Sequence, residues 1–331
     1  MIVMLFVMTG CRDEQVAEIT DTNTEDNRNF SEKNSGEMNT EKLNIVCANF
    51  PEYDWVCNLT KGSESVDVWL LVDDGTDIHS FQPSVDDMVK VSNCDMFIYA
   101  GGEGTSWMQD MLKNVENENM TVIDMLDFPY AYVICEDGHD HEEEHEGEHV
   151  YDEHVWLSLS NAQNICKYIY ECLIDMDAEH VDLYEANYES YTAKLTELDD
   201  AYKMAVESSK SKAIVFADRF PFIYMMEDYA LGYSAAFPGC STETDASFQT
   251  IITLAERVDE LNLKNVVVLE NSATEVAQSV IDNTEQKNAG VVTMNSMQSV
   301  AAKDIDGGAT YLKYMEENLE SLVKALEISE E

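Results

Sequence analysis

Short apolar runs alternate along the chain with longer segments in which apolar residues recur every three or four positions. The short runs predict buried β-strands, and the periodic segments predict amphipathic helices. Strands are expected at 43–48, 66–72, 96–100, 121–124, 213–217, 233–237, 265–270 and 290–294. Because helices are expected between them, at 84–92, 107–115, 160–175, 224–231, 247–261, 274–286 and 311–326, each half is predicted to be a mostly parallel sheet flanked by helices.

Between the two halves lies one uninterrupted helical pattern at 182–209 that contains no Gly or Pro. At about 1.5 Å per residue this helix would be roughly 40 Å long, more than a small domain needs. We therefore predict an α/β protein with a front lobe (42–180), an interlobe helix (181–209) and a rear lobe (210–328). In open α/β sheets ligands bind where strands deliver their carboxyl ends, which here is the cleft between the lobes.

The first 41 residues have a different composition. Residues 12–41 are mostly polar and acidic, which predicts a flexible tether because such a segment cannot bury a core. Residues 1–11 form an apolar run that is too short to span a bilayer and ends in Gly10 and Cys11. This pattern resembles the lipobox of a bacterial lipoprotein signal peptide. The resemblance implies lipidation of Cys11 and a chain anchored at the extracytoplasmic face of the cell membrane.

The net charge of −47 excludes nucleic acid as a partner, because little is present to neutralise phosphates. It favours a protein that gathers cations, although a merely acidic or salt-adapted surface gives the same number. Five of the seven histidines fall in or just after an acidic loop at 136–150. Neutral imidazole is the commonest ligand for zinc-like ions, so we predict an auxiliary metal-binding loop formed by His139, His141, His145 and His149. The alternative is a compositional accident on an acidic protein.

Several motifs resemble those of the metal-binding receptors of bacterial ABC importers, specifically the zinc and manganese group with a rigid interlobe helix. The resemblance covers about 42–326 and is carried by Phe50-Pro51-x-Tyr53-Asp54-Trp55, Gly75-x-x-x-His79-Ser80-Phe81-x-Pro83-Ser84, the acidic loop followed by Glu153-His154-Val155-Trp156-Leu157-Ser158, Phe216-x-Asp218-x-Phe220, and Gly239-Cys240-Ser241-x-Glu243-Thr244.

The resemblance implies metal ligands at His79 and His154, each beside carboxylates able to orient the imidazole. In the rear lobe the family's usual ligand positions fall on Ala217 and Asn295. Asp218, next to Ala217, is therefore expected to act as a substitute, with the alternative that it pairs with Arg219 and is structural. Glu270, at the end of a predicted strand, is the other candidate, with a salt-bridge role as its alternative.

The implied function is a monomeric, lipid-anchored receptor that captures zinc in the interlobe cleft and delivers it to an ABC permease. Capture of manganese or iron is the alternative if carboxylates dominate the site. A zinc-dependent hydrolase would need an open coordination position, and the sequence contains no HExxH motif or evident catalytic triad, so we expect no enzymatic activity. A host-surface adhesin is left open as a secondary role.

Overall fold

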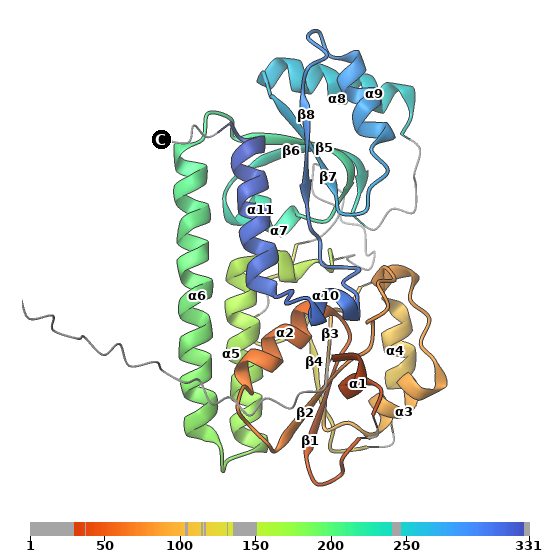
Figure 1. The fold of residues 1–331 in the computed structure, drawn as a ribbon, viewed down its shortest axis with the longest axis vertical. Coiled ribbons are helices and arrows are strands. Elements are labelled where there is room, and N and C mark those ends of the chain that lie inside the picture. Colours follow the sequence, from red (N-terminus) through yellow and green to blue (C-terminus); the bar gives the residue numbers. More distant parts are fainter. Residues whose placement is uncertain are drawn as a thin grey trace, which may run out of the picture.

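The computed structural model describes residues 30–327 except 37, 103–104, 114, 116, 131, 135–150 and 240–245. In this part of the chain two lobes are stacked along the long axis, and α6 (Val181–Ser208) runs beside both of them (Figure 1). Its 28 residues correspond to about 42 Å. The predicted architecture, two α/β lobes joined by one long helix, is confirmed.

The front lobe contains a parallel sheet in the order β2-β1-β3-β4. Alternate residues of its strands are buried on opposite faces: Ile45 and Ile98 face α2 and α5, whereas Val46 and Phe97 face α3 and α4. Burial on both faces explains why these strands are continuous apolar runs. The elements are α1 (Phe30–Asn34), β1 (Leu43–Cys47), α2 (Phe50–Leu59), β2 (Val66–Leu70), η1 (Ile78–Ser80), α3 (Val85–Asn93), β3 (Met96–Tyr99), α4 (Ser106–Leu112), β4 (Thr121–Asp124), η2 (Val155–Leu157) and α5 (Leu159–Met176).

The rear lobe repeats this plan with a parallel sheet in the order β6-β5-β7-β8. One face of the sheet packs on α8 and α9 through Val215, Ala217 and Val268, and the other joins the core that continues into the front lobe. The elements are β5 (Ala213–Phe220), α7 (Ile223–Asp228), β6 (Gly232–Pro238), α8 (Phe248–Leu261), β7 (Asn265–Leu269), α9 (Glu275–Asn283), β8 (Gly290–Met294), α10 (Ala302–Asp306) and α11 (Tyr311–Ala325).

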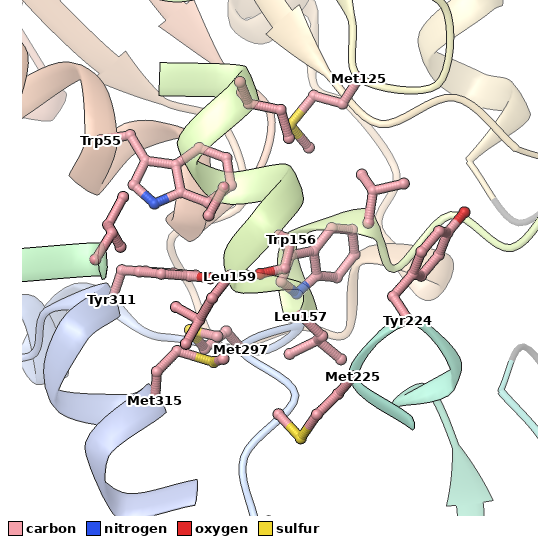
Figure 2. Close-up of a cluster of buried hydrophobic side chains, with 14 of the residues drawn as sticks. Trp55, Met125, Trp156, Leu157, Leu159, Tyr224, Met225, Met297, Tyr311 and Met315 are labelled. Atoms are coloured by element: carbon pink, nitrogen blue, oxygen red, sulfur yellow. Dashed lines mark hydrogen bonds between the residues drawn. The ribbon is translucent and has the colours of Figure 1, made fainter. Parts of the chain in front are cut away.

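One buried cluster crosses the boundary between the lobes. Figure 2 shows Trp156, from η2, lying among Tyr224 and Met225 of α7 and Met297 of the rear lobe. The Trp156 indole Nε1 donates to the Ser296 carbonyl at 2.8 Å, and the Tyr311 hydroxyl of α11 donates to the Trp156 carbonyl at 2.7 Å. A shared apolar core with buried hydrogen bonds holds the lobes at a fixed separation.

Three helices were not predicted. Helix α2 begins at Phe50 with Pro51 in its first turn, a favourable position because the missing N–H is not needed there. Helices α1 and α10 have five residues each, too few for a periodic pattern. Among the described residues, no helix is both long and apolar enough to cross a membrane.

Helix α1 lies inside the segment predicted to be a flexible tether, so that prediction is wrong for its last part. Phe30 is buried and packs edge-on against Tyr53, with ring centroids 5.3 Å apart. The Asn34 side chain pairs with the backbone of Leu70 through two hydrogen bonds of 2.9 Å, as a further strand would. The Phe30 N–H also donates to Asp306 of α10 at 2.7 Å, so α1 contacts both lobes. Residues 1–29, including Cys11, lie outside the described part.

Candidate metal centre

His79 sits on η1, in the loop that follows the carboxyl end of β2. The Asp77 side chain caps this short helix by accepting from the His79 backbone N–H at 3.1 Å. The ring is held from its other side, because Nδ1 lies 2.9 Å from Oε1 of Glu153. A carboxylate beside Nδ1 leaves Nε2 as the nitrogen that faces the cleft.

His154 lies at the start of η2 and is fully buried. Asp152 Oδ1 accepts from the His154 backbone N–H at 2.9 Å and lies 3.0 Å from the ring Nδ1. Burial, the largest single influence, would lower the pKa of the His154 ring, but the carboxylates of Asp152, Glu153 and Asp77 together raise it above its ordinary value. Trp156 packs edge-on against the ring at 5.3 Å. The imidazole therefore has one fixed orientation, with Nε2 exposed to the cleft.

The two rings converge on one point. Their centroids are 5.5 Å apart, and the side-chain amide nitrogen of Gln298 lies 2.6 Å from His79 Nε2 and 2.7 Å from His154 Nε2. With protons on both Nδ1 atoms, both Nε2 lone pairs point at this amide. A metal ion placed there would be bound by two imidazole nitrogens, which are typical zinc ligands.

Glu153 completes the cluster. Potential ligand atoms of His79, Glu153 and His154 all lie within 4.8 Å of one another. Among the described residues, this is the cluster of side chains that could hold a metal ion. The carboxylate is buried beneath Gly102, whose φ of +129° suits glycine alone. A Cβ at Gly102 would collide with Glu153 Oε2. The close approach of this backbone therefore fixes the carboxylate beside the imidazoles.

Gln298 comes from the rear lobe, in the segment that follows β8. This segment crosses to the front lobe: the Ile78 N–H donates to the Gln298 carbonyl at 3.2 Å, and the Ala302 N–H donates to the Asp73 carbonyl at 2.7 Å. Asp74 and Ala301 form an antiparallel bridge beside these bonds. The backbone of Gln298 is thus fastened to the same loop that carries His79.

The structure does not bring the two predicted rear-lobe ligands into the cluster. Asp218 accepts from the backbone N–H of Arg219 at 2.8 Å and of Leu269 at 3.2 Å, so its oxygens tie β5 to β7. Glu270 accepts from the Ser296 hydroxyl at 2.6 Å and the Ser296 N–H at 2.8 Å. Burial raises the pKa of Glu270 despite these bonds. Both carboxylates support the loops around the cleft instead of facing the imidazoles.

The alternative given for Asp218, a structural pairing with Arg219, is met only through the Arg219 backbone N–H. The Arg219 guanidinium reaches across the cleft and donates from Nη1 to Asp77 Oδ2 at 3.2 Å. Both side chains are partly exposed, at 32% and 24%, so this pair adds little to stability. Its position matters more, because it joins the rear lobe to the turn that holds His79.

Sequence reasoning missed Gln298 and did not choose Glu153 as a ligand. Ala217 packs in the core beneath α8 and α9, and Asn295 shapes a turn by accepting from the Met297 N–H at 2.8 Å. The turn places Met297 in the left-handed region, with φ of 61°, and so turns the next side chain, Gln298, toward the imidazoles. The sequence did indicate a role for Glu153, since this residue directly precedes His154. The predicted loop ligands His139, His141, His145 and His149 lie outside the described residues.

Comparison with known proteins gives a consistent result. The profile of the family described as "Zinc-uptake complex component A periplasmic" matches residues 45–325. Zinc-binding lipoprotein AdcA of Streptococcus pneumoniae strain R6 is 30% identical over 287 residues, covering 85% of this chain and 55% of the relative. High-affinity zinc uptake system protein ZnuA of Bacillus subtilis is 26% identical over 312 residues, covering 90% of this chain and 92% of the relative. The chain thus spans about half the length of the AdcA proteins it matches.

Solved structures agree with this assignment. The Zn(II)-bound ZnuA-like domain of Streptococcus pneumoniae AdcA aligns with a TM-score of 0.68 at 25% identity, covering 86% of this chain and 99% of that domain. The metal-dependent lipoprotein YcdH of Bacillus subtilis shares the fold with a TM-score of 0.70. With a profile match across most of its length and the same two-lobed fold, this chain belongs to the family of periplasmic zinc-uptake components.

Proposed function

We propose that this protein is an extracytoplasmic receptor that captures Zn²⁺ in the interlobe cleft and delivers it to an ABC permease. The observation that carries the proposal is the convergence of His79 Nε2 and His154 Nε2 on one point, 2.6 and 2.7 Å from the Gln298 amide nitrogen. A bound ion would replace that amide between the rings. Asp152 and Glu153, each beside an Nδ1 atom, would hold the imidazoles in the ligating orientation.

The donor set favours zinc over manganese. Two imidazoles suit a borderline ion, whereas manganese prefers carboxylate and water oxygens. Glu153, a member of the same cluster, and the Gln298 amide oxygen, after rotation of the amide, are the candidate oxygen donors. A manganese receptor of the same family is the alternative, motivated by the Mn-bound periplasmic metal-binding protein of Candidatus Liberibacter asiaticus, which shares the fold.

Delivery, anchoring and the absence of catalysis are part of the same proposal, and the relatives motivate them. The Bacillus relative is named for a zinc uptake system, which motivates the permease as partner. AdcA of Streptococcus pneumoniae is named a lipoprotein, which supports lipidation at Cys11. A receptor binds and releases its ion unchanged, so we infer no enzymatic activity and a monomer as the working form. The histidines of the 136–150 loop would collect ions at higher metal concentration.

Native mass spectrometry of the tag-free protein, with elemental analysis of the bound metal, tests the proposal. We expect one tightly bound zinc ion in the wild type and its loss in the double variant His79→Ala/His154→Ala. The matched control is His180→Ala, since His180 also has its Nδ1 beside a carboxylate, 2.9 Å from Asp177 Oδ1, but stands outside the cluster. Unchanged tight binding in the double variant would refute the site.

A further inference from the structure

We propose that the ion enters this site as a chelate with a small α-amino acid, of which histidine is the test case. This inference rests on the proposed capture of zinc at His79 and His154 and specifies the form in which the ion arrives. It comes from the space beside the imidazoles and from the charges that line it.

A cavity of about 660 Å³ lies between the lobes next to the cluster. Gln298 lines this cavity and also contacts both imidazoles, so its side chain links the cavity to the point where the ion would sit. A four-coordinate zinc ion enclosed by protein ligands needs no such space, whereas roughly 300–1,000 Å³ is the range for pockets that hold small organic molecules. The volume therefore favours an ion that carries a small ligand.

The charge of the donor set also leaves room for another ligand. His79 and His154 bind as neutral imidazoles and Gln298 is a neutral amide, so Glu153 supplies the one negative charge in the described cluster against the two positive charges of zinc. The described rear lobe adds no carboxylate, imidazole or thiolate to it. An α-amino acid brings one carboxylate and one amine, which together supply two donor atoms and one negative charge.

The walls of the cavity match a molecule with both kinds of charge. Arg219 and Lys303 line it as cations, among five carboxylates at Asp74, Asp77, Asp218, Glu270 and Asp304. An arginine has five N–H donors arranged to bind a carboxylate, and the described contacts use one of them, from Nη1 to Asp77. The Ser296 hydroxyl stands between the acidic and the amide side chains of the same wall. Arg219 is therefore placed to bind the carboxylate of the chelating amino acid while the ion faces the imidazoles.

Native mass spectrometry of the full chain tests the inference with three additions: Zn²⁺ alone, L-histidine alone, and Zn²⁺ with L-histidine. We expect a protein–zinc–histidine species of 1:1:1 composition with the mixture and no histidine adduct without zinc. The variant Arg219→Gln should keep the zinc species but lose about tenfold or more of the ternary species, as expected for loss of a charged hydrogen bond. Both proteins keep the 136–150 loop, so the difference reports on the cavity.

Arg257→Gln is the matched control, because Arg257 makes a similar single contact, from Nη1 to Glu260 at 3.0 Å, on the outside of α8. It should leave the ternary species unchanged. Zinc binding without any ternary species in the wild type would overturn the inference and leave the proposed zinc capture intact. A ternary species with citrate but not with histidine would also overturn it. Loss of zinc binding itself would instead remove the proposed function.

Discussion

Asp152 tests whether the orientation of His154 controls metal affinity. The change Asp152→Ala removes one carboxylate oxygen, Oδ1, that makes two contacts with His154. It lies 3.0 Å from the ring Nδ1 and accepts from the backbone N–H at 2.9 Å. The hydrogen bond to the backbone N–H is present with and without the ion, so its loss does not change the zinc affinity. Loss of the ring contact does change it, because a bound cation makes Nδ1–H a stronger donor. Losing such a partner typically costs 10- to 100-fold in metal affinity, or about 1.4–2.7 kcal/mol.

Competition titration against a zinc chelator at pH 8 measures this change. Asp177→Ala is the matched control, because Asp177 lies 2.9 Å from the Nδ1 of His180, which is not part of the cluster. A thermal unfolding curve checks that each variant folds. Equal zinc affinity in Asp152→Ala, Asp177→Ala and the wild type would refute the argument that this carboxylate orients a ligand.

Three further outcomes are expected. Burial lowers the pKa of His154, but the carboxylates of Asp152, Glu153 and Asp77 together raise it above its usual 6.5. Protons therefore compete with zinc below that raised pKa, and calorimetry across pH 5–8 should show zinc affinity falling as pH drops, with the fall beginning above pH 6.5. Burial raises the pKa of Glu52 from 4.5 to about 8. Between these two pH values the folded state therefore holds a proton on Glu52 that the unfolded state has released. Stability should then fall as pH rises from 4.5 to 8, by on the order of 4–5 kcal/mol relative to Glu52→Gln; urea unfolding at pH 5 and 8 measures this, and parallel profiles would contradict it. Trp156→Phe leaves the buried Ser296 carbonyl without its indole donor, which should cost about 1–3 kcal/mol in thermal unfolding, and an unchanged Tm would contradict the role given to this bond.

Much of the fold was predictable because its strands are buried on both faces. Such strands are continuous apolar runs, as in β1 and β7, and the helices between them are amphipathic enough to be read from spacing. The predicted helix at 84–92 is α3, and Ser84 caps it in a capping box with Asp87. Helix α2 was missed because its residues are buried on several sides and show no clear apolar stripe.

The front half of the candidate site was predictable and the rear half was not. His79 and His154 stand in motifs that resemble those of the metal-receptor family, and this resemblance implied their place at the cleft. The rear-lobe contribution depends on the left-handed backbone conformation of Met297, which no sequence pattern predicts. That one conformation brings Gln298 to the imidazoles, while Asp218 and Glu270 are used by backbone amides that a sequence cannot reveal.

The attachment of the Gln298 segment to the front lobe has a kinetic consequence. Since Ile78, Asp73 and Asp74 hold this segment through backbone contacts, exposing the imidazoles does not require the two halves of the molecule to separate. Movement of the Gln298 side chain from between the two rings would be a local change, unlike the microsecond-to-millisecond hinge motions of whole domains. The rate of zinc binding should then be set by how quickly the incoming ion loses its bound water molecules.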